Sequence, residues 1–218
     1  MGDNHTDPTV HQPEAVPTAS PATAMSRPEA RGRASGVAVL AFFAWAWSAW
    51  ALSDAPPVLQ RAVPVPVVVI SVALLVLSAL LYRRSAAASP DVEVANRGRV
   101  GRRFGSVVAG EFIGLVALAV LAGATGHAVA IPAVVCLGVG VHFFPLARLF
   151  GVALYTAAGV GLCVAAIAAA VLALATGSDA WWVTVSGFGA AVVLYATSIR
   201  LGYVTWRHTR PGPVHTGA

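Results

Sequence analysis

Six long apolar segments dominate the sequence and restrict the folds that it can adopt. They lie at about residues 36–52, 63–82, 104–124, 127–144, 149–176 and 181–203. A helix needs roughly 20 apolar residues to cross the hydrocarbon core of a bilayer, so each segment is suited to one crossing. The strands of a transmembrane barrel would instead alternate in polarity over about ten residues. The sequence therefore predicts an all-α fold, a polytopic membrane bundle of six transmembrane helices.

The charged residues agree with a membrane location. They make up 11% of the chain, against 57% hydrophobic residues, whereas an ordinary soluble domain carries about 25% charged residues. The net charge is +5, but the arginines lie at the ends of apolar segments, where membrane orientation explains them better than nucleic acid does. The predicted partner is the lipid bilayer, binding to nucleic acid is not expected, and protein partners and oligomeric state are left open.

The arginines also predict the orientation of the chain. Every arginine except Arg61 falls in an alternate connection: Arg27, Arg31 and Arg33 before the first segment, Arg83, Arg84, Arg97, Arg99, Arg102 and Arg103 between the second and third, Arg148 between the fourth and fifth, and Arg200, Arg207 and Arg210 at the end of the sixth. Cytoplasmic connections carry the excess of basic residues in membrane proteins. Both termini are therefore expected in the cytoplasm, and the protein is expected to be a multi-pass protein of a bacterial inner membrane.

The two ends of the chain differ in composition from the apolar part. Residues 1–35 are rich in Pro, Ala, Thr and Glu, a composition that cannot offset the entropy of folding. We expect a disordered cytoplasmic tail at 1–35, a transmembrane domain at 36–204 and a short cytoplasmic tail at 205–218. Met25 is an alternative start site within the first tail.

Two ionisable side chains stand out inside the apolar segments. Glu111 is the only acid so placed and His142 the only histidine, and an ionisable group in hydrocarbon usually has a partner or a task because its burial is costly. In the predicted topology, Tyr155 and Arg200 lie at a similar depth in the cytoplasmic leaflet. These four residues are the candidate sites for a ligand or a proton.

Small residues lie near these polar groups at helical spacing. Gly110 and Gly114 form a GxxxG pair beside Glu111, a motif that lets another helix backbone approach closely. The expected helix-packing glycines are Gly110, Gly114, Gly138, Gly159 and Gly189. Each polar group is attached to the small-residue side of its segment, so a cluster of the four is geometrically allowed.

Each candidate also has a purely structural interpretation. The Arg200 side chain could extend to lipid phosphates, and Tyr155 could anchor the helix at the interface. His142 could bond a backbone carbonyl freed near Pro145. Glu111 is the residue that such explanations fit least well.

Motifs for catalysis, metals and cofactors are missing from the sequence. Residues 186–189 do not match the G-x-S-x-G pattern of a serine nucleophile, and there is no H-E-x-x-H, paired acidic motif or P-loop. Cys136 and Cys163 have no second ligand at metal spacing, and a bis-histidine haem would need a second histidine beside His142. The sequence therefore favours a protein that is not an enzyme and predicts no catalytic residue, metal or cofactor.

Within residues 136–161, the stretch VHFFPLARLFGVALYTAAGVG resembles a group of small uncharacterised bacterial multi-pass membrane proteins. In that group a Gly-rich helix ends in a His-x-x-Pro motif and is followed by a short turn and a helix that carries a tyrosine. The matching positions here are His142, Pro145 and Tyr155. The resemblance implies a domain of six or seven helices and no particular activity.

Two functions follow from the sequence. The first is small-ligand or proton-linked binding or transport through a polar cluster in the cytoplasmic half of the bundle. The second is a structural or accessory role, in which the same cluster only fixes helix packing.

Overall fold

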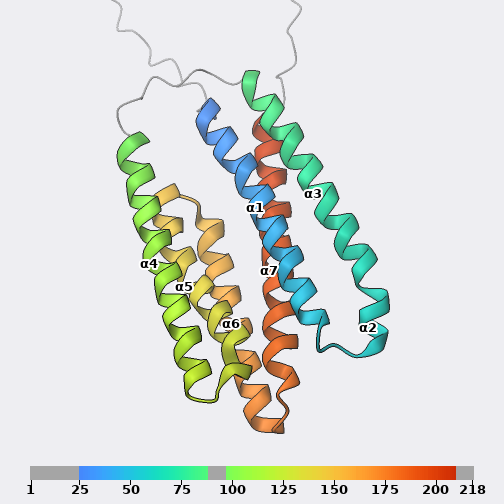
Figure 1. Ribbon diagram of the computed structural model, residues 1–218. Helices are drawn as coiled ribbons and strands as arrows, with labels where there is room; N and C mark the ends of the chain where they lie inside the picture. The colour runs from blue at the N-terminus through green and yellow to red at the C-terminus, as the bar shows by residue number, and fades with distance from the viewer. Residues whose placement is uncertain (1–24, 88–96, 210–218) are drawn as a thin grey trace, which may run out of the picture.

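The computed structural model describes residues 25–87 and 97–209, and within them all regular structure is helical. The predicted all-α class is therefore confirmed for the described residues. The helices are α1 (Arg27–Leu52), α2 (Pro57–Ala62), α3 (Pro64–Arg84), α4 (Arg97–Ala124), α5 (Ile131–Phe150), α6 (Ala153–Thr176) and α7 (Ala180–His208), with 3-10 turns η1 (Ser85–Ala87) and η2 (Ala128–Ala130) (Figure 1).

Five helical segments are long and apolar enough to cross a membrane: α1, α3, α5 together with η2 (Ala128–Phe150), α6 and α7. In α4 the shorter stretch Ile113–Ala124 is apolar. These segments are those of a multi-pass membrane protein, and they match five of the six predicted spans.

Helix α7 lies at the centre of the bundle (Figure 1). On one side, α1 packs along α7, and α3 packs against α1. On the other side, α6 packs along α7, α5 packs against α6, and α4 packs against α5. Helices α1 and α5 both pack on α7 but barely touch each other. The bundle therefore has two halves that are joined through α7.

Helix α1 begins earlier than the sequence predicted. The hydroxyl oxygen of Ser26 accepts a hydrogen bond from the backbone N–H of Glu29, and the Glu29 carboxylate pairs with Arg33 at 2.7 Å. A serine cap, a proline in the first turn and an i,i+4 ion pair each favour a helix start. The predicted disordered tail of residues 1–35 is therefore wrong for residues 27–35, while residues 1–24 lie outside the described part.

Helix α7 extends past the domain boundary predicted at residue 204. Residues 205–208 belong to α7, and the last turn stays helical because Trp206 packs against the core and under the Arg84 guanidinium. Residues 210–218 lie outside the described part.

Helix α5 continues through Pro145 and ends at Phe150, where Gly151 adopts a left-handed φ of 64°. Glycine is the usual residue at such an end because it has no Cβ to clash. The sequence placed the end of this helix near residue 144. His142 is therefore eight residues, or about 12 Å, from the helix end rather than a few residues from it.

Side-chain hydroxyls link helices across the bundle. Ser78 of α3 donates to the Ala34 carbonyl oxygen at 2.8 Å, and Ser198 of α7 donates to the Val37 carbonyl oxygen at 3.0 Å. Both acceptors lie on α1, so α1 is held from two sides. Such bonds stabilise membrane bundles by about 0.6–2 kcal/mol each.

The glycines predicted to pack helices divide into two groups. A Cβ built on Gly159 would lie 2.7 Å from the Gly140 carbonyl oxygen, and one on Gly138 would meet the Leu115 side chain. Gly189 similarly faces Ala165 across the α6–α7 contact. These three glycines do permit close helix contact.

Gly110 and Gly114 have open space in the described structure and are exposed, so the GxxxG pair of α4 does not form a helix contact there. Helix α4 instead inserts Leu115 over Gly138 of α5. The close approach of Gly140 to Gly159 was not predicted, because Gly140 has no glycine four residues away.

Candidate functional site

A cavity of about 520 Å³ lies between α1 and α5. It forms because the two helices pack on α7 without closing on each other, and Leu194 of α7 contributes to its lining. The lining residues are Val39, Leu40, Phe43, Ala46, Trp47 and Trp50 of α1, Val135, Val139, His142, Phe143 and Leu146 of α5, and Leu194. The cavity follows twelve residues of each helix, 39–50 and 135–146, and the first and last of these are roughly 16 Å apart along the axis.

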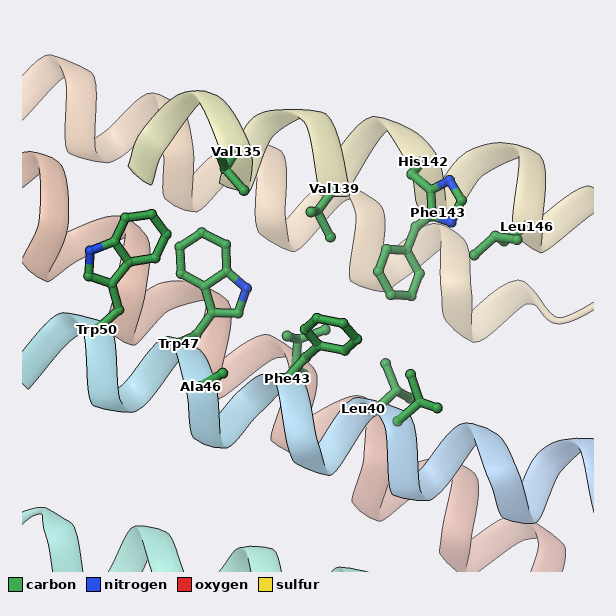
Figure 2. Close-up of a pocket in the computed structure, with 12 residues that line it drawn as sticks. Leu40, Phe43, Ala46, Trp47, Trp50, Val135, Val139, His142, Phe143 and Leu146 are labelled. Atoms are coloured by element: carbon green, nitrogen blue, oxygen red, sulfur yellow. The ribbon is translucent and has the colours of Figure 1, made fainter. Parts of the chain in front are cut away.

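The α1 wall of the cavity is aromatic. Phe43, Trp47 and Trp50 follow one another at spacings of four and three residues, which places them on one side of the helix, and Figure 2 shows their rings directed toward α5. Trp47 stacks on Trp50 with ring centroids 5.4 Å apart. Trp47 is 6% exposed, whereas Phe43 is 50% and Trp50 40% exposed. The middle of the wall is therefore buried in the protein, and both of its ends reach the molecular surface.

The α5 wall is mostly aliphatic, with the Phe143 ring and one imidazole. Val135, Val139, His142 and Leu146 repeat at spacings of four, three and four residues, and His142 lies at the opposite end of the cavity from Trp50 (Figure 2). Among the described lining residues, His142 is the only ionisable one. An elongated, mostly apolar space with an imidazole near one end favours binding of a molecule with an apolar body and one polar end.

Tyr155 lies beside this end of the cavity but does not line it. Its ring contacts that of Phe143 with centroids 5.8 Å apart, and Phe143 in turn contacts His142 with centroids 6.4 Å apart. The Tyr155 hydroxyl lies 3.2 Å from the position of a Cβ atom on Gly36. Two of the four predicted site residues, His142 and Tyr155, are thus linked through one phenylalanine ring.

The side chain of Glu111 lies outside the described residues, but its helix and register are described. Helix α4 runs antiparallel to α5, and Leu115 contacts the position of Gly138. Residue 111 is one turn before Leu115, and His142 is one turn after Gly138. This register places the backbones of Glu111 and His142 at the same level of neighbouring helices.

Arg200 does not join the interior group. Its side chain is exposed, and so are Ile199 and Tyr203, whereas Thr197 and Leu201 are buried. Arg200 follows Leu194 by six residues, which is a rotation of about 120° around the helix axis. Arg200 therefore lies on an exposed face of α7 and not on the protein-facing side on which the sequence placed it.

The aromatic wall was missed by the sequence reasoning, which concentrated on ionisable residues. Its signal was the presence of three aromatic residues at positions 43, 47 and 50 on one helical face. That signal did not reveal which helix would lie opposite.

The described residues hold no group of three His, Cys, Asp or Glu side chains suited to a metal. Cys136 is buried and its thiol donates to the Leu162 carbonyl oxygen, with sulfur and oxygen 3.4 Å apart. The described lining residues offer apolar contact and hydrogen bonding by the His142 imidazole. No protein-family model, curated protein or solved structure matches the chain.

Proposed function

We propose that the protein binds a single-chain amphiphile, such as a long-chain fatty acid, in the cavity between α1 and α5. The apolar chain lies along Phe43, Trp47 and Val139, and the polar end is hydrogen-bonded by His142. The observation that supports this proposal is the elongated cavity of about 520 Å³, in which His142 is the only ionisable side chain among the described lining residues. Its volume is within the range of about 300–1,000 Å³ that is usual for small-molecule sites.

The polar end of the ligand supplies the selectivity in this proposal. Lipid tails are as apolar as the cavity walls, so transfer of a hydrocarbon from the bilayer to the cavity gains little from the hydrophobic effect. Shape and the hydrogen bond to His142 then distinguish the ligand from bulk lipid. The sequence predicted a cluster of four residues for small-ligand or proton-linked binding or transport. In the present proposal the binding site is at His142, and Arg200 lies outside this site.

The proposed topology has six spans, with both termini in the cytoplasm of a bacterium and the protein in the inner membrane. Alternating arginines support this orientation. The ends of α1, α3 and α7 that carry the arginines also lie together at one end of the bundle (Figure 1). His142 then lies in the cytoplasmic half.

Alkaline phosphatase fusions will test this topology, since the enzyme is active only outside the cytoplasm. We expect active fusions after residues 55, 126 and 178 and inactive fusions after residues 87, 151 and 209. If α4 does not cross, the fusion after residue 126 will be inactive and the one after residue 151 active, which would contradict six spans.

A cavity-filling variant will test ligand binding. Val139→Phe places an aromatic ring inside the cavity, and we expect the affinity for diazirine-labelled palmitic acid to fall about tenfold, an effect of the size that steric overpacking produces. Purified protein in micelles is cross-linked with the probe, the labelled peptides are identified by mass spectrometry, and unlabelled palmitic acid serves as the competitor. Labelling within residues 39–50 and 135–146 should be saturable.

Val141→Phe is the matched control, because Val141 lies on the same helix and is 54% exposed. It should retain the wild-type affinity. Labelling that is not competed by palmitic acid, or an equal loss in both valine variants, would contradict a ligand site in the cavity.

A structural or accessory role is the second candidate function. It is supported by the interhelical bonds of Ser78 and Ser198, which show polar side chains of this bundle acting as packing contacts. In that case the His142 region would stabilise the α4–α5–α6 half without binding a ligand. The histidine variants described in the Discussion separate the two functions.

A further inference from the structure

The cytoplasmic ends of α1, α3 and α7 form a basic and aromatic surface, which we call the arginine–aromatic surface. It consists of Arg31 of α1, Tyr82, Arg83 and Arg84 of α3, and Tyr203, Trp206 and Arg207 of α7. It is separate from the cavity, to which none of its residues contributes.

Each of three guanidinium groups lies over an aromatic ring in this surface. The central carbon of Arg84 is 3.6 Å from the centroid of the Trp206 ring, that of Arg31 is 5.3 Å from Tyr82, and that of Arg207 is 5.8 Å from Tyr203. The first two contacts join α3 to α7 and to α1. They hold the Arg31 and Arg84 side chains against neighbouring helices, whereas the Arg207 contact lies within α7.

The charge of the surface is strongly positive within the described residues. The ion pair described at this end is Arg33 with Glu29, on the first turns of α1, and the described stretches of α3 and α7 contain no acid at this end. Arg83, Arg84 and Arg207 are exposed. An anion that approaches the surface therefore meets several guanidinium groups and no described carboxylate on α3 or α7.

The stacked arrangement suits a phosphate in particular. When a guanidinium plane lies on an aromatic face, its N–H edge remains available for bidentate bonding to phosphate oxygens. Tyrosine and tryptophan prefer the headgroup level of a bilayer. Leu80 of α3 and Tyr203 are 42% and 51% exposed beside the arginines, which gives an attached acyl chain an apolar surface to follow.

We infer that the arginine–aromatic surface binds the phosphate of an anionic phospholipid, with Arg84 stacked on Trp206 as the principal contact. Charge complementarity and the adjoining apolar surface identify the occupant as a lipid rather than a soluble phosphate. This inference does not depend on the ligand proposed for the cavity.

The test uses the full chain in nanodiscs that contain equal amounts of phosphatidylglycerol and phosphatidylcholine with the same acyl chains. Lipids retained after transfer to detergent are counted by native mass spectrometry. We expect phosphatidylglycerol to be enriched, and we expect Arg84→Gln to reduce the enrichment about fivefold, the factor expected for one basic residue near an anionic surface. Arg84→Lys, which keeps the charge but not the planar stack, should give an intermediate value.

Arg61→Gln is the matched control, because Arg61 is an exposed arginine of α2 at the opposite end of the bundle. It should leave the enrichment unchanged, and circular dichroism will verify that all variants are folded. Equal retention of the two lipids by the wild type, an equal effect of Arg61→Gln, or displacement of the lipid by soluble glycerol phosphate would overturn the inference. If Arg84→Gln does not fold, Arg207→Gln tests the same surface by the same count.

Discussion

Gly159→Leu should prevent the α5–α6 half of the protein from packing, with a loss of at least about 3 kcal/mol in the free energy of unfolding. A Cβ at this position would lie 2.7 Å from the Gly140 carbonyl oxygen and 3.1 Å from the Phe143 Cβ. The first of these is a backbone atom, so no side-chain rotation relieves the clash and the helices must separate. The measurement is equilibrium unfolding in mixed micelles of dodecylmaltoside and sodium dodecyl sulfate.

Gly114→Leu is the control for this substitution, since it makes the same chemical change at an exposed position with no described neighbour within 4 Å. Its free energy of unfolding should stay within about 0.5 kcal/mol of the wild-type value. Equal stabilities of the two variants would show that α5 and α6 do not cross at Gly140 and Gly159.

His142→Phe should lower the affinity for palmitic acid by about tenfold to a hundredfold. Phenylalanine keeps an aromatic ring at this position but cannot hydrogen-bond the polar end of palmitic acid. The affinity for hexadecane, which has no polar end, should stay unchanged. Both compounds are measured as competitors of the diazirine-labelled palmitic acid. His142→Gln, which can still hydrogen-bond, should lose less affinity for palmitic acid than His142→Phe.

The two ligands also distinguish the two candidate functions. Equal losses for palmitic acid and hexadecane would mean that His142→Phe disturbs the cavity rather than the polar contact. A protein that shows no saturable binding of either ligand, and that unfolds more easily after His142→Phe, would support the structural role.

The local sequence determined the helices. Each long apolar segment became a helix because its backbone groups must be satisfied within the segment if it is to lie in a membrane. Local signals also set helix ends, as Ser26 and Gly151 show. The earlier start of α1 at Arg27 could have been found from the Ser26 cap and the Glu29–Arg33 spacing, but the polar composition of residues 1–35 obscured it.

The faces of these helices were harder to predict. Gly159 and Gly189 were identified as packing positions, whereas Gly110 and Gly114 make no described contact and Arg200 is exposed. In a soluble protein the polar side of a helix marks its outer face. Here lipid and protein interior are both apolar, so hydropathy does not distinguish the two faces of a spanning helix.

The sequence alone determined that the chain would form long apolar helices, and that His142 would lie among apolar residues of one of them. The tertiary structure decided that the aromatic face of α1 and the His142 face of α5 would lie opposite each other across a cavity. That arrangement depends on the packing of both helices on α7. Helix α7 begins more than 40 residues after the start of α5. The physical reason is that the contacts between side chains of different helices, and not the hydropathy of any one helix, fix how each helix is rotated about its axis.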